Sequence, residues 1–206
     1  MSLDAPAVGR AVVCASGIIY WAGVSVQAAR IRRRVGRTPN VRPRGAREKL
    51  LWLGWLLVIA VWIGQPLIMT RFAQAWLFSP HRLLPEGVGF ALGLVLVVLG
   101  HAGTYWSYAA LGDSWRMGIS SREKTTLITC GPYSRVRHPI YAFQLLILLG
   151  AAFLLPTALS VLVLCFHAVL CRLKASSEEA YLAGIHAEAY REYSLRTGRF
   201  LPRLGR

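Results

Sequence analysis

The chain has 206 residues, of which 55% are hydrophobic and 16% charged, and its formal net charge is +15 at pH 7. Its four cysteines show no CxxC spacing, so we expect neither a disulfide framework nor a metal site. Such a positive charge often indicates nucleic-acid binding, but here the basic residues border long apolar runs. Anionic lipid headgroups are therefore the predicted partners, and nucleic acid is not.

Four runs of the chain contain no Asp, Glu, Lys or Arg: residues 11–29, 50–70, 87–112 and 140–171. A helix needs about 20 apolar residues to cross a bilayer, so these runs predict an integral membrane protein and argue against a soluble helical core. The last run is too long for one crossing. Pro156 divides it into halves of roughly 16 residues, each about 24 Å long at the helical rise. We predict an all-α membrane protein with about five transmembrane helices, the last two forming a hairpin.

The distribution of positive residues predicts the orientation. Residues 30–49 carry nine Lys and Arg against one Glu, whereas residues 71–86 carry only Arg71 and Arg82. Positive loops stay in the cytoplasm, so the N-terminus is predicted outside and the C-terminus cytoplasmic. The first run lacks a convincing cleavage site and is read as a retained helix. The richness in Ala, Gly and Arg suggests a bacterial inner membrane.

We expect a single membrane domain over residues 1–206, with transmembrane helices over 1–110 and the functional region over 111–206. Pro139 fits the first turn of a helix, where its missing N–H costs nothing. Arg137 and His138 then lie beside unpaired backbone donors at the mouth of that helix. Because the hairpin returns both of its ends to one membrane face, these two residues are predicted to lie close to Arg172, Lys174 and Glu178.

A further helix is predicted after the hairpin. Residues 176–179 read Ser-Ser-Glu-Glu, a capping-box pattern that predicts a helix from Ser176 to about Leu195. Leu182, Ile185 and Ala189 recur at helical spacing along it. We therefore expect one face of this helix to be buried.

Several motifs in the second half of the chain together resemble the isoprenylcysteine carboxyl methyltransferase family and its bacterial relatives. They are LITCGPY at 127–133, RHPIY at 137–141, the pair Glu178 and Glu179, Tyr190 and Tyr193, and RFLP at 199–202. One such motif would be weak evidence, but their order and spacing make the set specific. The resemblance covers residues 111–202.

The resemblance implies a methyltransferase that uses S-adenosylmethionine from the cytosol and takes a lipophilic or small acceptor from the bilayer. Its cofactor contacts fall on Thr125, Thr126, Leu127, Ile128, Tyr133, His138, Pro139, Ile140, Tyr141 and Glu178. Its substrate-contacting arginine falls on Lys174, and Arg199 is added as a second candidate for substrate binding. His138 and Arg137 are the catalytic candidates.

Three positions depart from the family. Lysine at 174 keeps the positive charge but loses the planar two-pronged grip of arginine on a carboxylate. Thr125 stands where eukaryotic members have histidine, and Phe143 where many relatives have glycine. The first departure puts a prenylcysteine-like substrate in doubt.

These residue types suit methyl transfer, which needs alignment and exclusion of water more than a catalytic triad. Glu178 is a partner for the cofactor's ammonium, and His138 or backbone N–H groups for its carboxylate. Tyr133 and Tyr141 are placed to pack on the adenine or face the sulfonium. A carboxylate or thiolate acceptor is already nucleophilic, whereas an amine or hydroxyl needs a base, for which His138 is the candidate.

Other interpretations stay open. Tyr133 and Tyr141 are typical of an interfacial aromatic belt, and His101 and His167 of packing histidines within apolar runs. The membrane sterol reductases carry a related Arg-His-Pro-x-Tyr element and use NADPH. A cluster of cations for that cofactor is available at Arg191, Arg196, Arg199 and Arg203. A small non-enzymatic membrane scaffold is the third possibility.

Overall fold

The computed structural model describes residues 5–36, 39, 45–116 and 126–203, and its regular elements there are all helical. The long helices are α1 (Ala5–Val35), α2 (Ala46–Ile68), α3 (Glu86–Leu111), α4 (Pro139–Leu154) and α5 (Ala158–Arg196). Three short turns of 3-10 helix accompany them: η1 (Trp76–Phe78), η2 (Gly112–Ser114) and η3 (Gly131–Ser134). The predicted all-α architecture is confirmed.

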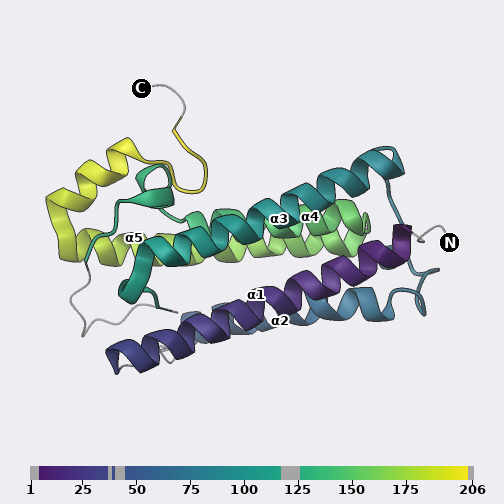
Figure 1. The fold of residues 1–206 in the computed structure, drawn as a ribbon, viewed down its shortest axis with the longest axis horizontal. Helices are drawn as coiled ribbons and strands as arrows, with labels where there is room; N and C mark the ends of the chain where they lie inside the picture. Colours follow the sequence, from purple (N-terminus) through teal and green to yellow (C-terminus); the bar gives the residue numbers. More distant parts are fainter. Residues whose placement is uncertain (1–4, 37–38, 40–44, 117–125, 204–206) are drawn as a thin grey trace.

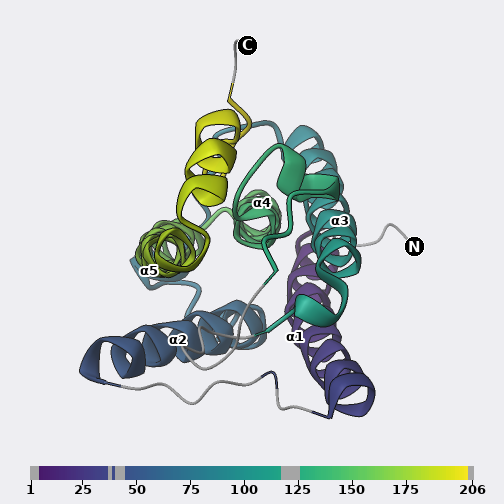
Figure 2. The ribbon, with the colours of Figure 1, turned by 90° about the vertical axis from the view of Figure 1, so that its left-hand side faces the viewer.

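The helices form two layers that run roughly side by side (Figure 1). Viewed nearly end-on, α4 lies between α3 and α5, and α1 and α2 lie across from them (Figure 2). Within the described residues, α1, α2, α3 with its extension to Ser114, and α5 are long and apolar enough to cross a membrane. At 16 residues, α4 is about 24 Å long and falls short of a hydrocarbon core of about 30 Å.

The predicted hairpin is present, and its turn lies at Pro156. Helix α4 ends at Leu154, and α5 begins at Ala158. The Thr157 side chain caps α5 by accepting a hydrogen bond of 3.2 Å from the Ser160 N–H. Gln65 of α2 donates to the hydroxyls of both residues, at 2.6 and 2.9 Å. This buried polar contact joins α2 to the start of α5.

Glycines let α3 and α4 approach each other at backbone distance. A Cβ at Gly93 would lie 2.9 Å from the Gly150 carbonyl oxygen, and one at Gly150 would lie 2.7 Å from that of Gly93. Small residues permit such close helix packing in membranes. Gly103 similarly makes room for the ring of Phe143, one of the positions that depart from the resembled family. Helix α4 is thereby held closely against α3.

The two histidines within apolar runs lie in the helix packing. His101 has contacts to the Val97 and Ser16 carbonyl oxygens at 2.9 and 3.2 Å. His167 is fully buried, and its Nε2 lies 3.3 Å from the Cys171 sulfur. The other ring nitrogen of His167 has no partner among the described residues.

The predicted helix start at Ser176 is wrong. Helix α5 runs continuously through this position, and the Ser176 hydroxyl donates to the Arg172 carbonyl one turn earlier at 3.0 Å. No Gly or Pro interrupts residues 158–175, so helix propagates from the membrane half and the serine bonds back to its own helix. The predicted buried face is also wrong, since Ile185 and Ala189 are both exposed.

The helix breaks at Ala187 instead. This alanine has φ 39° and ψ −110°, a backbone conformation that non-glycine residues rarely adopt. The last turns of α5 then leave the axis of its long first part, as the yellow end of the ribbon in Figure 1 shows. The break directs residues 188–199 back toward the start of α4.

Candidate active site

Helix α4 begins at Pro139, as the sequence predicts. Pro139 is the first helical residue and is buried, and His138 precedes it with non-helical φ and ψ of −127° and 63°. The 3-10 turn η3 leads into this point and places Tyr133 in the interior. Proline at the first helical position needs no hydrogen-bond partner, so the helix starts at a defined residue.

The returning C-terminal segment pairs with the chain just before α4. The N–H groups of Arg137 and His138 donate to the carbonyls of Gly198 and Arg199 at 2.8 and 3.0 Å. In the other direction, the Gly198 N–H donates to the Arg135 carbonyl at 3.2 Å. A Cβ at Gly198 would lie 1.7 Å from the Leu201 carbonyl oxygen, so only glycine fits there.

Glu179 is the centre of an ion cluster behind the start of α4. It accepts from Arg137 Nε at 2.9 Å, and both Nε and Nη2 of Arg199 donate to it. Arg137 Nη1 also donates to the carbonyls of Thr197 and Ser194, at 2.6 and 3.2 Å. The cluster thus ties the middle of α5, the start of α4 and the chain end together.

His138 lies between two carboxylates. Its Nδ1 is 3.4 Å from Glu178 Oε2, and its Nε2 is 3.2 Å from Glu179 Oε1. Burial by itself lowers the pKa of an imidazole, but the hydrogen bonds to Glu178 and Glu179 outweigh it and raise the pKa of His138 above its usual 6.5. Only the protonated ring has a donor for each carboxylate, so this site favours the imidazolium.

Tyr141 completes the group one turn into α4. Its hydroxyl donates to Glu178 Oε1 at 2.8 Å, and its ring stacks on His138 with centroids 5.7 Å apart at 11°. The predicted proximity of His138 to Glu178 is therefore confirmed, although forty positions separate them in sequence. The hairpin brings them together because both of its ends return to one end of the bundle.

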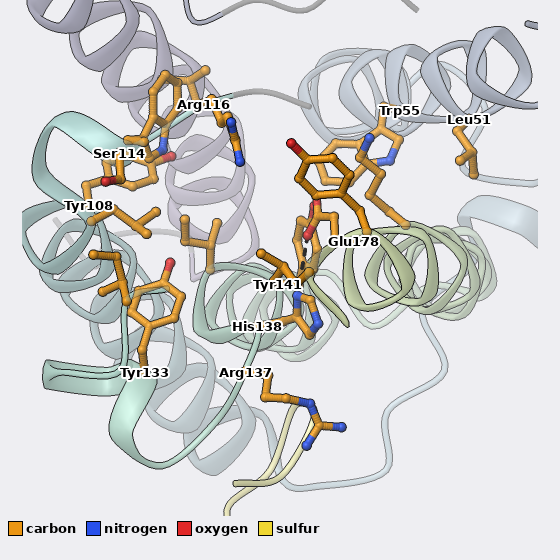
Figure 3. A pocket seen from close by; sticks show the side chains of 18 of the residues that line it. Leu51, Trp55, Tyr108, Ser114, Arg116, Tyr133, Arg137, His138, Tyr141 and Glu178 are labelled. Carbon is orange, nitrogen blue, oxygen red and sulfur yellow. Dashed lines mark hydrogen bonds and ion pairs between the residues drawn. The ribbon is translucent and has the colours of Figure 1, made fainter. Parts of the chain in front are cut away.

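A cavity of about 300 Å³ opens beside this group (Figure 3). Its polar end includes Arg137, His138, Lys174 and Glu178. Its other walls are mainly aromatic and aliphatic side chains, which come from all five long helices and from the segments between them, with Glu48, Ser114, Arg116 and Thr126 among them. A concave site with a few convergent polar groups in an apolar lining is the usual form of a small-molecule site, and its volume lies at the lower end of the range of about 300 to 1,000 Å³.

Most of the predicted site residues line this cavity. They are Thr126, Leu127, Ile128, Tyr133, Arg137, His138, Ile140, Tyr141, Lys174 and Glu178. Thr125 lies outside the described residues. Pro139 is buried without lining the cavity, and Arg199 is bound to Glu179 instead of reaching it.

The sequence analysis missed several lining residues. Tyr181 and Leu182 follow Glu178 by three and four positions, so helical spacing was a usable signal for them. Trp115 and Arg116 are different, because their position shortly after the third uncharged run places them at the edge of the pocket, and both do line it. The Arg116 guanidinium carbon lies 5.9 Å from the Tyr181 ring centroid. The α1 and α2 walls, with Tyr20 and Trp55 among them, had no local signal because their uncharged runs indicated only membrane helices.

The described residues contain no group of three or more His, Cys, Asp or Glu side chains placed to hold a metal ion.

Comparison with known proteins supports a methyltransferase family. Residues 88–189 match the family model of phospholipid methyltransferases. This match includes most of α3, which the resemblance did not, and it stops short of the returning C-terminal segment. It supports membrane methyltransferase activity in general, the broader part of what the sequence predicted. Assignment to the isoprenylcysteine branch stays a prediction.

Two curated relatives carry other names. The cobalt-zinc-cadmium resistance protein CzcN of Cupriavidus metallidurans is 38% identical over 145 residues, which are 69% of this chain and 64% of that protein. The nickel-cobalt-cadmium resistance protein NccN of Alcaligenes xylosoxydans xylosoxydans is 34% identical over 116 residues, 55% of this chain and 53% of that protein. The chain thus spans between half and two thirds of the length of these relatives.

Proposed function

We propose that the protein transfers a methyl group from S-adenosylmethionine to a lipophilic acceptor, a carboxylate or a thiol, at the membrane surface. The observation that carries this proposal is a single cavity that joins the His138, Tyr141 and Glu178 group to an apolar wall from α1 and α2. The match to phospholipid methyltransferases supports the reaction class.

The polar end suits the cofactor by its donor set. The carboxylate of Glu178 is a partner for the amino-acid ammonium, and the first-turn N–H groups of Ile140 and Tyr141 are donors for the carboxylate. The rings of Tyr133 and Tyr141 offer faces to the adenine or to a cation. When bound, the cofactor would supply an electrophilic methyl group on a sulfonium. The electron pair of the carbon–sulfur bond would remain on sulfur as a neutral thioether when the methyl group is transferred.

The contacts of each polar residue suggest its role. His138 is paired with two carboxylates, so we assign it the role of holding Glu178 by a hydrogen bond and not that of a base. An acceptor that needs no base, a carboxylate or a thiolate, therefore fits best. Arg137 is a positioning residue, because its guanidinium is bonded to Glu179 and to two carbonyls. Lys174 lines the cavity and is the candidate partner for an anionic acceptor.

The reductase interpretation finds no support in the placement of its arginines. Arg191 and Arg196 pair with neighbouring glutamates, and Arg199 pairs with Glu179. Arg203 donates to the Leu195 carbonyl. None of these four is among the described residues that line the cavity, so they do not form a phosphate site there.

Calorimetric titration of the detergent-purified protein tests the proposal. S-adenosylmethionine and its demethylated product are expected to bind saturably, and Glu178→Gln is expected to weaken both by tenfold or more. Glu188→Gln is the matched control, since this exposed glutamate lies on the same helix, pairs with Arg191 and does not line the cavity. Binding of NADPH with silence from both sulfur compounds would overturn the proposal.

The names of the two relatives suggest a second candidate role, a part in resistance to heavy metals. If methyl transfer underlies such a role, a bacterial host that expresses the protein should tolerate cobalt, zinc or cadmium better than one that expresses Glu178→Gln. Equal tolerance in hosts that express the wild type and Glu178→Gln would show that metal resistance does not depend on methyl transfer.

A further inference from the structure

The α2 wall of the cavity is a straight stripe of side chains. Leu51, Trp55 and Ile59 are four residues apart and therefore lie on one face of the helix. Trp52 and Leu56 flank them and also line the cavity. Ile59 follows Leu51 by eight positions, which is about 12 Å at the helical rise. The α2 wall of the cavity is therefore apolar from Leu51 to Ile59, and Glu48, one turn before Leu51, adds a carboxylate to it.

Trp55 is the point at which this stripe meets the polar group. Its ring lies 5.9 Å from that of Tyr141 at 62°, and 4.9 Å from that of His167 at 74°. Tyr141 in turn donates to Glu178. The indole therefore connects α2 to α4 and α5. In Figure 3, Trp55 and Leu51 extend from α2 on the same side of the cavity as Glu178.

Helix α2 lies outside the residues that match the methyltransferase family. The wall that it contributes is therefore separate from the part of the chain that supports the reaction class. A large planar side chain in the wall of a cavity limits the size of what fits there, because protein interiors are close-packed and do not yield freely.

We propose that Trp55 determines which hydrocarbon the cavity accepts. The occupant is an amphiphile with a single hydrocarbon chain, whose polar end lies beside Tyr141 and Lys174 and whose chain passes the indole along the α2 stripe. The indole sets the width of the passage toward Ile59 and so the preferred chain length. This inference rests on the proposed function only in taking the polar end of the occupant as the group that is methylated.

A chain-length series tests this inference. Saturated alkyl carboxylates from decanoate to octadecanoate would compete with a fluorescent fatty acid for the detergent-purified protein, with S-adenosylhomocysteine added in excess. Each affinity would be compared with that of the wild type for the same chain, so that partition into detergent cancels. The variants are Trp55→Ala and the milder Trp55→Phe. Leu57→Ala is the control, because Leu57 lies on α2, is exposed and does not line the cavity.

Trp55→Ala is expected to move the optimum to longer chains. Each additional buried methylene adds about fourfold in affinity. If the space left by the indole takes two more methylenes, the ratio of the affinity for the longest chain to that for the shortest should rise by about tenfold or more over the same ratio in wild type. Trp55→Phe should give a smaller shift in the same direction, and it serves if the alanine variant does not fold.

Three results would overturn the inference: an unchanged chain-length profile in both Trp55 variants, the same shift in Leu57→Ala, or no competition by any carboxylate with wild type. Binding of S-adenosylhomocysteine to the same samples, measured by calorimetry, reports separately on the proposed function. A shifted chain-length profile without that binding would uphold the role of Trp55 and reject methyl transfer.

Discussion

The two ends of the cavity are built in different ways. The polar end is held by directional contacts, in which Glu179 binds Arg137 and Arg199, and His138 lies between Glu178 and Glu179. The apolar end consists of side chains from α1 and α2 that contribute shape, with Trp55 as its aromatic contact to Tyr141. Changes at the polar end should therefore act on stability and cofactor binding together, whereas changes at the apolar wall should act on the choice of acceptor.

The largest effect is expected when the ion cluster loses its centre. Glu179→Ala leaves Arg137, Arg199 and His138 without their shared carboxylate. Removing one partner of a buried ion pair costs about 3–5 kcal/mol, so the melting temperature should fall and cofactor binding should be lost. Thermal unfolding in detergent measures the first and calorimetry the second. The exposed pair partner Glu192→Ala is the control, and an equal loss in both variants would argue against the cluster.

A smaller loss is expected at the chain return. Gly198→Ala places a Cβ against the Leu201 carbonyl, so the backbone pairing with residues 135–138 must shift. Overpacking of this kind typically costs about 1–3 kcal/mol. Gly184→Ala, on α5 with open space around it, is the control. Unfolding curves that coincide for the two variants would show that the return is not needed to hold the polar end together.

Tyr141→Phe should weaken cofactor binding with a smaller loss of stability than Glu179→Ala. It removes the hydroxyl that donates to Glu178 and keeps the ring that packs on Trp55 and His138. A hydrogen bond to a charged group contributes about 1.5–3 kcal/mol to stability, so the melting temperature should fall, but by less than in Glu179→Ala. Glu178 also loses the group that orients it, so affinity for S-adenosylmethionine should fall by roughly tenfold or more. Unchanged affinity by calorimetry would remove Tyr141 from the cofactor site.

The smallest effect is expected from pH. The folded pKa of His138 is raised above 6.5, so the protonated ring contributes stability that is present at lower pH and is lost as the pH rises through the folded pKa. The measurement starts at pH 6, just below the usual histidine pKa of about 6.5. As the pH is raised from there, the melting temperature of the wild type should fall more than that of His138→Asn. Parallel declines in the two proteins would show that this ring does not titrate as described.

Several site features follow from local sequence rules. Pro139 marks the start of α4 because its ring suits only the first helical position, and Pro156 marks the hairpin turn. A hairpin returns its ends to one face, which places His138 beside Glu178. In contrast, the capping-box pattern at Ser176 misled, because a helix already under way needs no cap there. The pairing of Arg199 with Glu179 depends on the break at Ala187, a position where an ordinary alanine gives no signal of a turn.

By itself, the sequence determined that this is an all-α membrane protein, where α4 begins and where the hairpin turns, because hydrophobic length and proline geometry act over a few neighbouring residues. The hairpin in turn places His138 beside Glu178. Only the tertiary structure decided that α1 and α2 complete the cavity, that Trp55 meets Tyr141 within it, and that Arg199 turns to Glu179. These contacts join segments far apart in the chain. They arise from the packing of helices against one another. The sequence of an uncharged run is apolar on every side of its helix, so it does not indicate which side faces which neighbour.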